Sequence, residues 1–165
     1  MLKPLIMLAT VFAIGLTTRD LQAQQANIAF GGMKQDTSLP VTLDADTLSI
    51  NNADGTAVFT GNVVVAQGDM RLTAGEVRVD YTPDGSGIKT LHATGGVTLI
   101  NAADAAEAKA AVYTIASGDV VMTGDVLLTQ GKNAISGQKL VLNLKAGTGV
   151  MEGRVQTVFN PGVKK

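Results

Sequence analysis

The chain contains no cysteine and no tryptophan, and it has a single histidine, His92. Without cysteine, neither a disulfide framework nor a thiolate metal site can form. With one histidine and no cysteine, the Cys-His and two-histidine metal arrangements are excluded. A lone histidine such as His92 is more often a surface or core residue than a catalyst, so we interpret it as structural. Aromatic residues make up only 4% of the chain, which disfavours a carbohydrate-binding or glycoside-hydrolysing jellyroll with aromatic platforms and paired carboxylates. We therefore expect no enzymatic activity and no cofactor.

Charged residues are also scarce, at 16%, and the 13 basic and 14 acidic side chains nearly balance. A nucleic-acid partner would need a basic face, so none is expected. Asp44 and Asp46 have the spacing of metal ligands, but a cation held by oxygen wants about six to eight donors. We interpret these two residues as a solvated strand edge, with a calcium site as the alternative. Gly85-Ser86-Gly87 lacks the lysine and the helix of a phosphate-binding loop and is interpreted as a turn.

One apolar run stands out, the 12 residues from Leu5 to Leu16. Lys3 precedes it, and a polar stretch ending in Ala23 follows it, which is the order typical of a secretory signal peptide. The run is shorter than the roughly 20 residues that a bilayer-spanning helix needs. We expect cleavage after Ala23 and export to the periplasm, with an uncleaved membrane anchor as the alternative.

A short motif occurs four times in the remaining chain. Four segments align without gaps, and their shared core is Thr/Glu-Gly-x-Val, with glycines 34, 29 and 29 residues apart. The segments are 56–63, 90–97, 119–126 and 148–155. Residues 61–81 and 124–144 match over a longer stretch, including Gln67-Gly68 against Gln130-Gly131, and Asn101 takes the glutamine position in the second copy. Internal repeats of this kind indicate stacked units that bury a shared interior.

The spacing within each copy is typical of β-strands. Short runs of Val, Leu and Ile alternate with polar residues, as in Val77-Arg78-Val79-Asp80, and they end at turns rich in Gly, Asn and Asp. A glycine inside such a run, as at Gly61 and Gly124, predicts a bulge or a corner. The Ala-rich stretch 102–111 has high helix propensity. Because the repeat places it where other copies have a strand, we interpret it as a distorted strand or loop, with a short helical turn as the alternative.

These observations divide the chain into a signal peptide at residues 1–23, a flexible lead-in at 24–40, an all-β domain at 41–159 and a polar tail at 160–165. The repeated motifs Ala45–Leu48, Phe59–Gly68 and Ala74–Tyr81 resemble those of the OstA-like (LptA-type) family of periplasmic lipopolysaccharide-transport proteins. The resemblance covers roughly residues 40–158. It implies a twisted open β-jellyroll of about 16 short antiparallel strands, with no enzymatic activity and no cofactor.

The resemblance also implies a partner and a route. The chain is expected to bridge the inner-membrane and outer-membrane jellyroll subunits of a lipopolysaccharide exporter and to hold the acyl chains of lipid A in an apolar groove. The candidate lining residues are those whose aliphatic positions recur across the copies. They are Phe59, Val63, Val65, Leu72, Val77, Leu99, Met122, Val126, Leu128, Ile135, Leu140 and Leu142. A groove and a sealed core have the same sequence pattern, so both interpretations of these positions stay open.

The terminal strands of an open jellyroll carry unpaired backbone groups, which favour strand addition between molecules. We expect head-to-tail self-association through the first and last strand regions, with a monomer as the alternative. The residues of this edge are Val41, Leu43, Leu48, Val155, Val158 and Phe159. A second function class is a structural β-repeat module of the envelope or matrix that carries no lipid.

Overall fold

The computed structural model describes residues 26–29 and 33–159. The expected signal peptide at 1–23 and the tail at 160–165 lie outside the described residues. The described part is all-β, as the strand spacing predicted, and it contains eleven strands. They are β1 (Ala26–Ala29), β2 (Thr42–Asp44), β3 (Thr47–Asn51), β4 (Thr56–Gln67), β5 (Met70–Tyr81), β6 (Ile88–Asn101), β7 (Asp104–Thr114), β8 (Asp119–Gln130), β9 (Asn133–Asn143), β10 (Thr148–Glu152) and β11 (Gln156–Val158).

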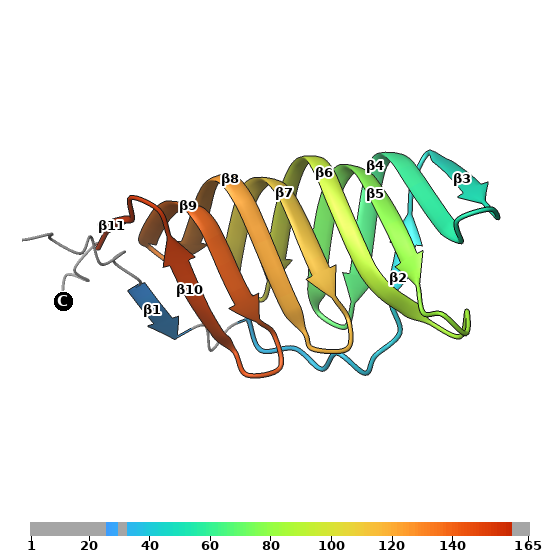
Figure 1. Cartoon of the computed structure of the whole chain (residues 1–165). Helices are drawn as coiled ribbons and strands as arrows, with labels where there is room; N and C mark the ends of the chain where they lie inside the picture. Colours follow the sequence, from blue (N-terminus) through green and yellow to red (C-terminus); the bar gives the residue numbers. More distant parts are fainter. Residues whose placement is uncertain (1–25, 30–32, 160–165) are drawn as a thin grey trace, which may run out of the picture.

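The strands form one twisted antiparallel sheet in which β4 to β9 pair in chain order. Each of these six long strands bends once near its middle, and Figure 1 shows the bends aligned along one side of the molecule. The register shifts at the bend in every pairing from β4–β5 to β8–β9. The sheet is therefore folded lengthwise, as expected for an open jellyroll.

The repeated Thr/Glu-Gly-x-Val motif makes these bends. On β4, β6 and β8, and between β10 and β11, the glycine and the residue after it both have positive φ. These two residues stand opposite one residue of the neighbouring strand, which is the arrangement of a β-bulge. The bulges predicted at Gly61 and Gly124 are thus confirmed, and all four copies of the motif occupy the same corner of the fold.

The bends divide the sheet into two arms. Arm A is defined by β2, β11 and the halves of the long strands paired in line with them, such as Val63–Gln67 of β4 and Met70–Ala74 of β5. Arm B is defined by β1, β3, β10 and the other halves. The hydrophobic core lies between the two arms, because each strand alternates buried and exposed side chains along both halves.

The number of strands differs from the expected figure of about 16. Six long strands run through the corner without a break, so the described residues contain eleven strands. The pairs β2–β3 and β10–β11 are themselves bent strands interrupted at the corner, by Ala45-Asp46 and by Gly153-Arg154. A bulge bends the backbone but keeps the flanking ladder, so the two halves of each long strand count as one strand here, and the number implied by the family resemblance is too high for this structure.

Two further segments differ from the sequence expectations. Most of the Ala-rich stretch belongs to β7, which pairs with β6 and β8 along its length, so the helical alternative is wrong. Pairing on both sides outweighs the helix propensity of alanine. The described residues of the segment before Val41, which was expected as a flexible lead-in outside the domain, pack against the fold. Its residues Ala26–Ala29 form β1 on the outer edge of β10, and Met33 is buried in the core.

Candidate functional site

The interior between the arms is lined by side chains in register. In arm A one row runs across six strands, with each residue paired to the next. It consists of Val65, Leu72, Leu99, Ala106, Leu128 and Ile135. All six are buried, and the half-buried Leu43 extends the row onto β2. This row is a continuous apolar wall along the length of the fold.

Arm B supplies the opposing wall. Its row nearest the bend consists of Phe59, Val77, Ala93, Ala111, Met122, Leu140 and Met151. Every member is buried except Phe59, which is half-buried and packs against the core. A second row, farther from the bend, includes Leu91, Tyr113, Val120 and Leu142. The two walls together make an apolar interior with almost no ionisable side chain.

The structure places all twelve predicted lining residues at this interior. Eleven are in the buried core, and Phe59 packs against it. Their contact with a lipid stays a prediction. In this structure they belong to one buried hydrophobic cluster, with Phe59 packed against it. Arm opening or side-chain rearrangement would have to make room for an acyl chain.

The side opposite the bends, where the turns of the two arms meet, is the mouth of the interior. Figure 1 shows the segment before β2 running along this side, beneath the turns. We call residues 33–40 the strap. The Gln35 N–H donates to the Leu144 carbonyl at 2.8 Å, and the Gln35 amide donates to the Gln67 carbonyl at 2.7 Å. The strap therefore connects the end of arm B to the end of arm A.

Gln67 is the central polar residue of the mouth and is 1% exposed. Its Nε2 donates to the strap carbonyls of Thr37, at 3.0 Å, and Leu39, at 2.8 Å. Its Oε1 accepts a 2.6 Å hydrogen bond from the hydroxyl of Tyr113, which comes from arm B. Burial raises the pKa of Tyr113 to about 12. The phenol therefore stays protonated and donates this bond across the interior at any physiological pH.

Sequence reasoning missed most of the mouth. The Gln-Gly repeat at 67–68 and 130–131 is visible in the sequence, but the repeat alone gives Gln67 no role. A glutamine at a strand end in several copies is a signal for a shared polar row. The strap and Tyr113 have no comparable signal, because the strap lies outside the repeats and the Tyr113–Gln67 bond joins residues 46 positions apart.

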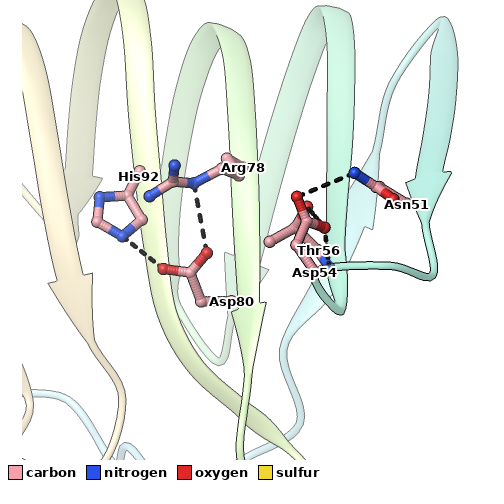
Figure 2. Close-up of polar contacts among 6 residues, drawn as sticks. All are labelled: Asn51, Asp54, Thr56, Arg78, Asp80 and His92. Carbon is pink, nitrogen blue, oxygen red and sulfur yellow. Dashed lines mark hydrogen bonds and ion pairs between the residues drawn. The ribbon is translucent and has the colours of Figure 1, made fainter.

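The outer face of arm B carries the single histidine. His92 Nε2 lies 2.8 Å from Asp80 Oδ2, and Arg78 Nε lies 3.3 Å from Asp80 Oδ1, as Figure 2 shows. Figure 2 also shows Asp54 accepting hydrogen bonds from Asn51 and Thr56 in the turn between β3 and β4. These contacts hold neighbouring strands and a turn together on the surface and are separated from the interior by the sheet.

The two aspartates considered as cation ligands are at the first corner. Asp46 accepts a 2.8 Å hydrogen bond from Asn62 and is exposed, as is Asp44. Among residues 26–29 and 33–159, no group of three or more His, Asp and Glu side chains is arranged to hold a metal ion. Within the same residues, no helix is long and apolar enough to cross a membrane.

The predicted association residues lie at the two ends of the folded sheet. Leu48 of β3 is 50% exposed, Val158 of β11 is 59% exposed, and Phe159 is 71% exposed. Val41, Leu43 and Val155 are half-buried and pack against the core. The C-terminal end differs from the expectation in one respect, because β1 pairs with β10. The outermost strands at that end are therefore β11 in arm A and β1 in arm B.

Comparisons with known proteins agree with this architecture. The family described as LptA/(LptD N-terminal domain) LPS transport protein matches residues 42–148. An uncharacterised protein of Rhizobium meliloti is 27% identical over 154 residues, covering 87% of this chain and 83% of the relative. The lipopolysaccharide export system protein LptA of Escherichia coli K12 is 28% identical over 126 residues, covering 73% of this chain and 68% of LptA.

A solved structure has the same fold. The structure of LptH, described as the LptA homologous periplasmic component of the lipopolysaccharide transport device of Pseudomonas aeruginosa, superposes with a TM-score of 0.69. The two sequences are 21% identical, and the match covers 77% of this chain and 99% of LptH. The open jellyroll implied by the family resemblance is thus confirmed as the fold.

Proposed function

Since the chain belongs to the family of LptA and LptD N-terminal lipopolysaccharide transport proteins, we propose that it carries lipopolysaccharide through the periplasm with the acyl chains in its interior. The observation that supports this most is the pair of apolar walls that continue in register across the fold. Moving acyl chains from water into such an interior contributes about 0.8 kcal/mol per methylene. Several chains would hold the lipid without many specific polar contacts.

The length of the apolar interior is suited to a lipid that moves along the fold. Eight bent strands at about 4.8 Å spacing give an interior about 33 Å long. The bends join the arms along one side, and the strap connects them along the other. Separation of the arms about the bends would widen the interior without breaking any strand pairing. It would require release of the strap from one arm and loss of the Tyr113–Gln67 hydrogen bond.

A bridging role requires contact with neighbouring jellyrolls. We propose that the inner-membrane and outer-membrane subunits of the exporter, or further copies of this chain, add strands at the two ends. The exposed Leu48 lies on the end strand β3, and Val158 and Phe159 lie at the opposite end, on and just after β11. Strand addition there would continue both arms and align the interiors. A structural module without lipid would use the same edges, so lipid contact is what separates the two functions.

Site-directed crosslinking tests the proposal. Leu72 is buried in arm A, and its neighbour Thr73 on the same strand points to the outer face. A photoreactive leucine analogue at position 72 should crosslink purified lipopolysaccharide, whereas the analogue at position 73 should give few adducts. Leu140 and the exposed Asp84 provide a second pair of interior and exterior positions. Equal yields from the interior and exterior positions would exclude the apolar interior as the lipid site.

A further inference from the structure

A row of side chains that are polar except for Met70 runs along the rim of arm A, where the apolar interior meets the mouth. The row contains the last residue of β4, β6 and β8 and the first residue of β5, β7 and β9, and all six face the interior side. The rim row consists of Gln67, Met70, Asn101, Asp104, Gln130 and Asn133. Three of its members, Gln67, Asn101 and Gln130, carry an amide at the same position of successive repeats.

Asn101 is the exceptional member. It is 2% exposed, and within the described part of the chain its Nδ2 is the buried side-chain polar atom that has no hydrogen-bond partner. A buried donor without an acceptor costs free energy, and such groups are rare in folded proteins. A buried amide donor left open at this position, two residues beyond the buried Leu99 on the same strand, indicates that an acceptor from outside the chain binds there.

The equivalent residue on β4 indicates the chemistry of that acceptor. Gln67 Nε2 binds two backbone carbonyl oxygens of the strap, at 3.0 and 2.8 Å. Gln130 Nε2, two strands beyond Asn101, binds the Asp104 carboxylate at 3.1 Å. The rim amides therefore act as donors, and one of them already holds carbonyl oxygens of an extended segment lying in the mouth.

Asp104, the neighbour of Asn101 on β7, favours a neutral oxygen acceptor over a charged one. The two residues are register partners, which places a carboxylate beside the amide. A phosphate oxygen next to that carboxylate would be repelled, whereas a neutral carbonyl would not. Ester and amide carbonyls connect the acyl chains of a lipid to its headgroup. They therefore lie at the boundary between hydrocarbon and polar groups, and Asn101 lies at the equivalent boundary between the apolar interior and the mouth of the protein.

We propose that Asn101 is a binding residue for the carbonyl oxygen of an acyl linkage, which sets how deep the acyl chains lie in the interior. This inference rests on the proposed function and names the part of the lipid that the rim recognises. Gln67 would offer a second such position if the strap carbonyls were displaced.

Replacement of Asn101 by leucine gives a test in which folding and binding change in opposite directions. The Asn101→Leu variant removes an unpartnered buried donor, so its thermal stability should equal or exceed that of the wild type. Its affinity for purified lipopolysaccharide should fall about fivefold, the loss of one neutral hydrogen bond. Thr98→Leu, a similar change on the outer face of the same strand, should leave the affinity unchanged.

A second experiment tests whether the recognised group is a carbonyl. It compares two single-chain glycerophospholipids of equal chain length, one ester-linked and one ether-linked. The wild type should bind the ester about fivefold more tightly than the ether, and Asn101→Leu should bind both equally. Unchanged lipopolysaccharide affinity in Asn101→Leu overturns the inference, whatever the phospholipids do, and so does equal binding of ester and ether by the wild type. If the wild type binds no lipopolysaccharide at all, the proposed function itself fails.

Discussion

The corner at Gly124 offers a quantitative test of how the repeated motif folds the sheet. Gly124 lies in the bend of β8 with a φ of +86°. A Cβ atom added there would lie 2.9 Å from the Cβ of Lys109 on β7, which is closer than carbon atoms pack. The left-handed backbone costs a non-glycine residue roughly 1–2 kcal/mol, and overpacking adds roughly 1–3 kcal/mol. Alanine offsets about 0.4–1 kcal/mol by restricting the unfolded chain.

The Gly124→Ala variant should therefore lower the free energy of unfolding by about 2–4 kcal/mol, measured by urea denaturation with far-ultraviolet circular dichroism. Gly55→Ala is the matched control, because Gly55 also has positive φ, +64°, but has open space around it. That variant should lose only about 1 kcal/mol. The difference between the two isolates the contact with Lys109 at the corner.

A double variant checks the physical cause. Lys109→Gly removes the Cβ that Gly124→Ala would meet and reproduces the glycine pair that Gly75 and Gly95 form at the neighbouring corner. The two changes should be non-additive by about 1–3 kcal/mol, with the double variant more stable than the sum predicts. Additive effects, or equal losses for Gly124→Ala and Gly55→Ala, would refute the packing argument.

Four other predictions concern the interior, the mouth, the end strand and the N-terminus. Leu72→Ala should cost about 2–5 kcal/mol of stability, against under about 1 kcal/mol for Thr73→Ala on the outer face of the same strand; similar losses would contradict the assignment of the two faces. Tyr113 holds its proton more tightly when folded, with a pKa of about 12 against about 10 unfolded, so wild-type stability should fall as pH rises from about 10 to 12. The profile of Tyr113→Phe should be flatter there, and an identical slope would show that the phenol does not contribute. Val158→Asp should abolish concentration-dependent self-association in analytical ultracentrifugation without lowering the melting temperature; self-association that persists would exclude this end strand. Mass spectrometry of the exported protein should give an N-terminus at Gln24, and a mature chain that keeps Met1 would contradict cleavage after Ala23.

Most of the interior could be predicted from local sequence. Alternation with a period of two assigns Leu72, Val77 and Leu140 to one face of their strands, and the glycine motif marks each corner. Both signals act within a few residues and recur in several copies, so they are readable without knowledge of the fold.

Local patterns in the chain are sufficient to predict the all-β class, the corner positions and the buried set of side chains. The contacts that close the interior, in contrast, exist only in the folded molecule. The bond between Tyr113 and Gln67, the strap at residues 33–40 and the pairing of β1 with β10 all join parts of the chain that are far apart in sequence. Such contacts depend on how the two arms face each other after folding. Neither side-chain periodicity nor a turn motif encodes that relation, and it is also what leaves the Asn101 amide buried at the rim.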